Sequence, residues 1–214
     1  LRMAEIPYEV KILKTPPKSK TGKIPYIELA DGSFLEDSGK IIEKLRNDRG
    51  IALDNHLSQD AVVQAHLLRR MIEEHLYYCV AWERWIPDEY WPVTKAGYFG
   101  SMPLLLRWFV PALFRRRVRA YVNGMGVGRM PVEELYARGE ADMTVISAML
   151  GSKDYMFGQP STSDAILYGW FGNLLAFPVE SPFQRALKSR PNLVAHTQRM
   201  RDRYWSATPH GTKS

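Results

Sequence analysis

The sequence predicts a two-domain protein, in which a small mixed α/β domain precedes a larger all-helical domain. Residues 1–50 hold short runs of β-forming residues joined by turn residues, whereas the apolar residues after about Ser58 recur at helical spacing. The chain has 214 residues, of which 45% are hydrophobic, and this is enough to bury a sizeable core. We place the two domains at residues 1–53 and 58–207, with a short linker between them.

Three short strands and one helix are expected in the first domain. Residues 8–13, 25–29 and 33–35 are expected to be strands, because they are rich in residues that favour extended backbone. Asp31 and Gly32 lie between the last two strands and indicate a hairpin with a type I′ turn, in which both central residues have positive φ. A helix should follow the hairpin and end at Gly50.

The second domain should begin with three helices. Ser58 is expected to cap the first, and residues 85–103 are expected to form a bend rich in proline and aromatic residues. The second helix covers residues 104–121 with a kink at Pro111, and the third covers residues 131–151.

Two more helices complete the second domain. Ser161 should open the first of these, because Asp164 three residues later completes a capping box. Gly169 and Gly172 in that helix are expected to let neighbouring helices approach closely. The last helix has a stripe of inward-facing residues over 193–204.

The charge balance allows two interpretations of one basic segment. The net charge is +6, and Arg115, Arg116, Arg117 and Arg119 lie close in the chain to the aromatic residues Trp108, Phe109 and Phe114. Such a segment could contact an anionic membrane surface weakly, although a solvated helix face is the simpler interpretation. No zinc-finger spacing, RNA-recognition motif or repeat accompanies it, so a nucleic-acid partner is not expected.

Further features favour a soluble cytoplasmic protein. The longest apolar stretch, residues 104–114, contains Arg107 and Pro111 and is shorter than the ~20 residues that span a bilayer. Cys79 is the only cysteine, so no internal disulfide can form, and no secretory signal is visible. The five histidines show no metal-ligand spacing with carboxylates or thiols, and we expect no metal site.

The residues with most chemical content flank the predicted hairpin. If the peptide bond before Pro25 is cis, the backbone groups of Ile24 face outward, where they can pair with an extended peptide. Asp37 and Ser38 lie at a predicted helix start, whose N–H groups favour a carboxylate, and Asp37 can accept from an amine. Glutathione offers a peptide, carboxylates and an amine. Taken alone, an edge proline and an ordinary helix cap explain the same residues.

This order of elements resembles the second half of the thioredoxin-like domain of glutathione transferases. Four further segments are similar to the failed-axon-connections and metaxin-like subfamily and its bacterial relatives: residues 73–77, 126–129, 157–165 and 191–193. The resemblance covers nearly the whole chain. It implies the glutathione-transferase fold, in which a strand and helix precede the segment resembling residues 1–5 and carry the thiol-activating Ser, Cys or Tyr. No catalytic residue is therefore assigned within this sequence.

The resemblance and the residues together give a set of site predictions. Ile24 and Pro25 are expected to bind the cysteinyl backbone of glutathione, Asp37 and Ser38 its γ-glutamyl end, and Lys23 its glycyl carboxylate. A second-substrate pocket is implied in the helical domain, lined by the aromatic residues Trp82, Trp85, Tyr90 and Trp91. Cys79 has apolar neighbours and is expected to be an inert buried thiol.

The expected function follows from these sites. The protein should bind glutathione as co-substrate and transfer its thiolate to a hydrophobic small-molecule electrophile, as a homodimer by family resemblance. The alternative is a non-catalytic scaffold with the transferase fold, or a membrane-associated adaptor of the metaxin type.

Overall fold

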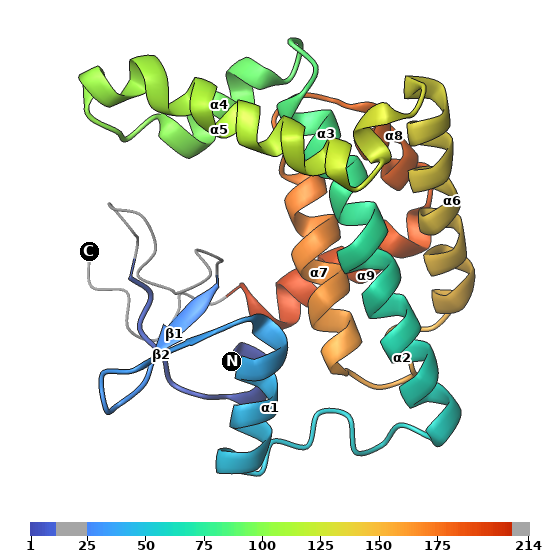
Figure 1. The fold of residues 1–214 in the computed structure, drawn as a ribbon. Coiled ribbons are helices and arrows are strands. Elements are labelled where there is room, and N and C mark those ends of the chain that lie inside the picture. Colours follow the sequence, from blue (N-terminus) through green and yellow to red (C-terminus); the bar gives the residue numbers. More distant parts are fainter. Residues whose placement is uncertain (12–24, 207–214) are drawn as a thin grey trace. The chain divides into compact units, whose positions relative to one another are not determined.

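The computed structural model describes residues 1–11 and 25–206 of the chain (Figure 1). Within this part, the chain forms two compact units, Leu1–Asn55 and His56–Ser206. The first unit contains a short 3₁₀ turn at Arg2–Ala4, an antiparallel hairpin and one helix, α1. The second unit is entirely helical.

The hairpin of the first unit is formed by β1 (Tyr26–Glu28) and β2 (Phe34–Glu36). Ile27 lies opposite Leu35 in its centre. The third expected strand, at residues 8–13, is not formed in its described part, residues 8–11. The described sheet has only the two strands β1 and β2, and residues 8–11 do not pair with either of them through backbone hydrogen bonds. A side-chain ion pair of 3.0 Å joins Lys11 Nζ to Glu28.

The hairpin prediction was right, but the turn type was not. Gly32 has a φ of +79°, whereas Asp31 is not among the described residues with positive φ. The Gly32 N–H donates to the carbonyl of Leu29, and the Leu29 N–H donates to the carbonyl of Ser33. The loop therefore has three residues, beginning with Ala30 and ending in a left-handed glycine, which is the next most common hairpin geometry after the two-residue turn.

Helix α1 (Ser38–Arg49) follows β2 directly. Its C-cap is Gly50, which adopts the left-handed conformation with a φ of +63°, as the sequence predicts. Ile41 is the buried residue of this helix. The rest of α1 is half-buried or exposed, so this short unit has a small core.

The second unit begins with a nearly continuous helical rod (Figure 1). Its parts are α2 (Gln59–Met71), a π-helical turn at Ile72–Leu76, and α3 (Tyr77–Trp85). Ser58 caps the rod as predicted, since its hydroxyl accepts from the N–H of Ala61 at 3.2 Å.

The remaining helices of the second unit follow in chain order. They are α4 (Trp91–Phe99), α5 (Leu104–Gly124), a 3₁₀ turn at Val127–Arg129, α6 (Val132–Leu150), α7 (Thr162–Leu175), α8 (Pro182–Lys188) and α9 (Pro191–Tyr204). Helix α4 corrects the prediction of a bend over residues 85–103. Pro92 lies in its first turn, where a missing N–H removes no hydrogen bond, so proline there does not break the helix.

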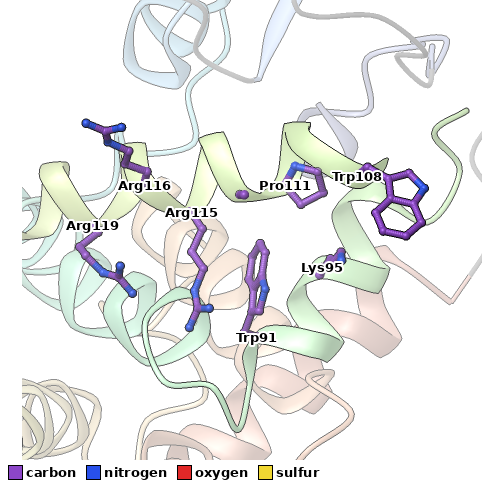
Figure 2. A pocket seen from close by; sticks show the side chains of 8 residues that line it. Trp91, Lys95, Trp108, Pro111, Arg115, Arg116 and Arg119 are labelled. Carbon is purple, nitrogen blue, oxygen red and sulfur yellow. The ribbon is translucent and has the colours of Figure 1, made fainter. Parts of the chain in front are cut away.

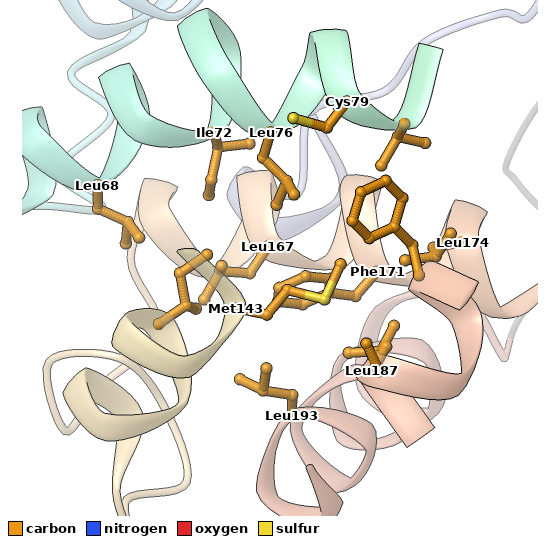
Figure 3. Packing of buried hydrophobic residues seen from close by; sticks show 14 of the residues in the cluster. Leu68, Ile72, Leu76, Cys79, Met143, Leu167, Phe171, Leu174, Leu187 and Leu193 are labelled. Atoms are coloured by element: carbon orange, nitrogen blue, oxygen red, sulfur yellow. The ribbon is translucent and has the colours of Figure 1, made fainter. Parts of the chain in front are cut away.

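The core of the second unit is built from apolar side chains of α2, α3, α6, α7, α8 and α9 (Figure 3). Several of its members have no more than 1% of their surface exposed, among them Ile72, Leu76, Met143, Leu167, Phe171, Leu187 and Leu193. The predicted capping box at the start of α7 is confirmed, with Ser161 and Asp164 bonded reciprocally.

Close helix approach occurs at a different glycine from those expected. An added Cβ at Gly169 would meet nothing within 4 Å, and one at Gly172 would meet Tyr168 of its own helix. At Gly139 on α6, by contrast, a Cβ would lie 2.4 Å from Cε1 of the fully buried Phe183 on α8. The prediction for Gly169 and Gly172 was therefore wrong, because spacing along one helix does not reveal which side faces a neighbour.

Gly139→Ala is expected to lower the free energy of unfolding by about 1–3 kcal/mol, because the added methyl group would overlap the ring of the fully buried Phe183. Gly169→Ala is the matched control, and it should raise the same quantity by about 0.5–1 kcal/mol through helix propensity. Urea denaturation of both variants measures the difference. Equal effects at the two positions would contradict the close contact between α6 and α8.

Candidate functional site

The hairpin register brings the two ends of the predicted glutathione site together. Tyr26 pairs with Glu36, so Pro25 and Asp37 directly flank the same end of the ladder. Pro25 and Asp37 are both exposed and Ser38 is half-buried. Ile24, Lys23 and the peptide bond that precedes Pro25 fall outside the described residues. The described part of the site thus consists of a strand entrance beside a helix start.

Asp37 is the N-cap of α1 and is already engaged with it. Its Oδ1 accepts from the N–H groups of Gly39 at 2.8 Å and Lys40 at 3.3 Å. Two of the N–H groups that a bound carboxylate could use are therefore satisfied by the chain itself. A second anion here would also be repelled by the Asp37 charge, whereas an ammonium group would be attracted to it.

The backbone of Asp37 is strained. Its φ is +74° and its ψ is 120°, which is an unusual conformation for a residue other than glycine. Such conformations cost of order 1–3 kcal/mol and concentrate at functional sites, where the surrounding structure holds them. Both the strained backbone and the exposed side chain make Asp37 a candidate ligand-binding residue of this unit.

A second feature is a pocket of about 260 Å³ between α4 and α5 (Figure 2). It is lined by Trp91 and Lys95 from α4, and by Trp108, Pro111, Ala112, Arg115, Arg116 and Arg119 from α5. The aromatic rings and cations suit an anionic ligand with an apolar part better than a neutral one. The arginine run is visible in the sequence, but nothing in the local pattern predicts that Lys95 and Trp91 face it across a helical hairpin.

Arg115 is the structural member of this pocket. It donates to the carbonyls of Trp85 at 2.9 Å and Ile86 at 2.7 Å and pairs with Asp88 at 2.6 Å, while its guanidinium lies 5.0 Å from the ring centre of Trp91. In the described part of the chain, Lys95, Arg116 and Arg119 make no ion pair of this kind. These three cations are available to a ligand.

The four aromatic residues predicted to line a second-substrate pocket have different positions. Trp91 lines the pocket just described. Trp82 packs against the core and lies 6.1 Å from Tyr136, between ring centres. Trp85 stacks on Trp91 at 5.6 Å, and Tyr90 is 4% exposed. Trp82, Trp85 and Tyr90 are therefore packing residues and not part of the lining of this pocket.

Cys79 lies in a row with a histidine and an aspartate, an order that can activate a thiol. His75 Nδ1 is 2.6 Å from Asp142, and His75 Nε2 is 4.0 Å from the Cys79 sulfur. However, Cys79 is 1% exposed, and burial raises the pKa of its thiol to about 12. The thiol stays protonated at neutral pH, and the predicted inert cysteine agrees with this environment.

Neither a metal cluster nor a membrane-spanning helix is found among the described residues. They contain no group of three or more His, Cys, Asp or Glu side chains arranged to hold a metal ion. None of the helices in residues 1–11 and 25–206 combines the length and apolar character needed to cross a membrane.

Comparison with known proteins shows the family to which this chain belongs. The model of the glutathione S-transferase N-terminal domain matches residues 1–90, and that of the C-terminal domain matches residues 139–200. The isoprene-epoxide glutathione S-transferase of Rhodococcus sp. (strain AD45) is 34% identical over 87% of this chain and 79% of its own length. The chain belongs to the glutathione S-transferase family. Its fold is accordingly the thioredoxin-like domain followed by the all-helical domain.

Two further relatives of this chain carry different names. Failed axon connections of Drosophila melanogaster is 28% identical over 95% of the chain, and metaxin-1 of Macaca fascicularis is 27% identical over 91%. The chain spans 51% and 64% of the length of these two relatives. No solved structure matches the chain significantly.

Proposed function

We propose that this protein binds glutathione at the strand entrance and helix start of the first unit and transfers its thiolate to a hydrophobic electrophile. The observation that carries the proposal is the position of Pro25 and Asp37 at one end of the hairpin, in a chain that belongs to the transferase family. Backbone at a strand entrance can pair with the peptide, and Asp37 can hold the γ-glutamyl amine. Catalysis would come from positioning and thiolate stabilisation.

The engagement of Asp37 with α1 refines these roles. Because Asp37 Oδ1 caps the helix, the γ-glutamyl carboxylate would have to use Ser38, and the amine would use the remaining carboxylate oxygen of Asp37. Lys23 and Ile24 keep their proposed roles at the glycyl carboxylate and the cysteinyl backbone. We further propose a cytoplasmic homodimer, as is usual in the family.

Asp37→Asn is expected to weaken glutathione binding about tenfold while leaving stability nearly unchanged. Asparagine still accepts from Gly39 and Lys40 as an N-cap, but it loses the charge that attracts an amine. Asp48→Asn, at the other end of the same helix, is the matched control, since Asp48 pairs only with the nearby Lys44 in the described residues. Titration calorimetry with glutathione on the full chain measures both.

Three results would count against this function. Undetectable glutathione binding at millimolar concentration would reject the site altogether. Equal affinity of Asp37→Asn and Asp48→Asn for glutathione would show that glutathione does not bind at the start of α1. Binding of glutathione without turnover of any electrophile would leave a binding protein rather than an enzyme.

The second candidate is a non-catalytic scaffold or membrane-associated adaptor with the transferase fold. Two observations favour it. The helix start that would bind a carboxylate is occupied by the Asp37 side chain, and the relatives include metaxin-1 and Failed axon connections. This candidate requires that the protein bind neither glutathione nor its S-conjugates, so the same calorimetry separates the two.

A further inference from the structure

The first turns of α5 expose an unusual amount of apolar surface. Leu105 and Trp108 are each 81% exposed, and Leu104 is 72% exposed. Phe109 and Leu113 follow at 58% each, and Tyr98 on the neighbouring α4 is 59% exposed. Isolated exposed leucines are ordinary in soluble proteins, but a contiguous set of this size on one hairpin marks an interaction surface.

Three of these apolar side chains share a helix face with the free cations. At 100° per residue, Leu105, Trp108 and Phe109 project from the same half of α5 as Arg116 and Arg119. Leu105 and Arg116 are about 16 Å apart along the axis at 1.5 Å per residue. The exposed face of α5 is therefore apolar in its first half and cationic in its second half, and Lys95 of α4 adds another cation beside it (Figure 2).

The charge of the whole chain is concentrated in this hairpin and the residues that follow it. Residues 91–132 contain seven Lys and Arg residues and no Asp or Glu. The rest of the sequence holds 22 basic and 23 acidic residues and is nearly neutral. The basic character of the protein is thus a local property of one stretch, which suits an extended negatively charged partner.

We propose that the α4–α5 hairpin docks this protein on an anionic membrane surface. The apolar first turns of α5 enter the interfacial layer, and Lys95, Arg116 and Arg119 contact lipid phosphates behind them. Interfacial helices bury their apolar face about 5–10 Å deep, and an amphipathic ring such as that of Trp108 is favoured at headgroup level. The proposed docking surface uses none of the residues of the proposed glutathione site, so it does not depend on glutathione binding.

The charge distribution favours a membrane over a second copy of this chain. An isologous contact centred on α5 would bring the same basic stretch from two copies together, and residues 91–132 supply no carboxylate to neutralise it. The exposed apolar side chains also spread around more than half of the helix circumference, since Leu104 points about 160–180° away from Leu106 and Leu113 at 100° per residue. That spread suits immersion in a fluid layer better than a flat protein interface.

Vesicle flotation tests the proposal with the full chain. The protein should float with phosphatidylcholine vesicles that contain phosphatidylserine, float much less with phosphatidylcholine alone, and be released from the anionic vesicles by high salt. Arg116→Glu with Arg119→Glu should lower partitioning at least about 25-fold, at about fivefold for each basic residue removed. Arg70→Glu with Arg201→Glu changes the net charge equally on exposed side chains elsewhere and should change partitioning less than twofold.

Insertion is tested separately from charge. Trp emission should shift to the blue on anionic vesicles, and this shift should be lost in Trp108→Phe although that variant still floats. Leu105→Asp should weaken flotation without changing the circular dichroism spectrum, since Leu105 makes no contact with the core.

Three outcomes would overturn the proposal. The first is equal binding to neutral and anionic vesicles, and the second is an equal loss in the Arg116/Arg119 and Arg70/Arg201 pairs. The third is a dimer in light scattering that Leu105→Asp dissociates while vesicles have no effect, which would assign the face to a second copy.

Discussion

Asp164→Ala is expected to lower the free energy of unfolding of the helical unit by about 3–5 kcal/mol, because it removes one partner from a fully buried polar cluster. Asp164 Oδ1 accepts from the Met156 N–H and from His196 Nε2, both at 2.8 Å. Its Oδ2 accepts from the N–H and hydroxyl of Ser161, also at 2.8 Å. The substitution leaves all of these donors buried without an acceptor.

His196 makes the loss larger. Within the described residues, its Nδ1 has no hydrogen-bond partner, so Asp164 supplies the bond that holds this ring in the core. Asp164→Asn should lower the free energy of unfolding by less than Asp164→Ala does, because one side-chain oxygen remains as an acceptor for Met156 and His196. It should still be destabilising, because the amide NH₂ group would then face the donors of Ser161. Asp202→Ala on the exposed side of α9 is the control and should change stability by less than about 0.5 kcal/mol. Chemical denaturation of the three variants gives the comparison.

The same cluster makes the free energy of unfolding depend on pH in the acid range. Burial alone would raise the pKa of Asp164, but the hydrogen bonds from His196, Met156 and Ser161 outweigh it and lower the pKa. The folded state therefore binds this proton more weakly than the unfolded state. Its contribution is present at neutral pH and is lost as the pH falls below about 4. Asp164→Ala should flatten that acid limb, and a limb as steep as in the parent protein would contradict the assignment.

Glu83→Ala is expected to lower the free energy of unfolding by about 2–4 kcal/mol, because Glu83 on α3 caps the start of α8 from a distance. The side chain is fully buried. It accepts from the Ser181 hydroxyl at 2.8 Å and from the Phe183 N–H at 3.0 Å. Glu83→Gln keeps an acceptor for Phe183 and should cost less than about 1 kcal/mol.

The pH dependence at Glu83 has the opposite sign to that at Asp164. Burial raises the pKa of Glu83 despite the hydrogen bonds from Phe183 and Ser181, so the folded state binds this proton more tightly than the unfolded state. Above the ordinary glutamate pKa, stability therefore falls as the pH rises towards the raised value. Glu83→Gln has no such slope. Between about pH 5 and 8, the free energy of unfolding of Glu83→Gln should therefore increase relative to that of the parent protein. A difference that stays constant over this pH range would refute the raised pKa.

These two carboxylates show what the sequence could predict. The Asp164 capping box depends on residues three positions apart, so it was visible as a local pattern. Glu83 reaches Ser181, 98 positions away, and nothing in the local sequence distinguishes it from an exposed helical glutamate. Long-range partners of this kind depend on how helices pack, and no periodicity encodes them.

The candidate sites divide in the same way. The hairpin, α1 and the position of Asp37 at the start of that helix followed from turn and capping signals close in the chain. The lining of the helical pocket did not, because Trp82 and Trp85 lie on α3 and Tyr90 precedes α4, and the packing of the helices decides which ring faces α5. Aromatic density predicted a cluster but could not separate its packing members from its lining.

The shielded thiol of Cys79 has a practical consequence for studying this molecule. Since it is the only cysteine of the sequence and is both buried and protonated, maleimide reagents should leave the folded protein unmodified. A cysteine introduced on the exposed part of α5 would then be a unique attachment point. A fluorophore or spin label placed there could report on the surroundings of the hairpin without a cysteine-free background having to be engineered.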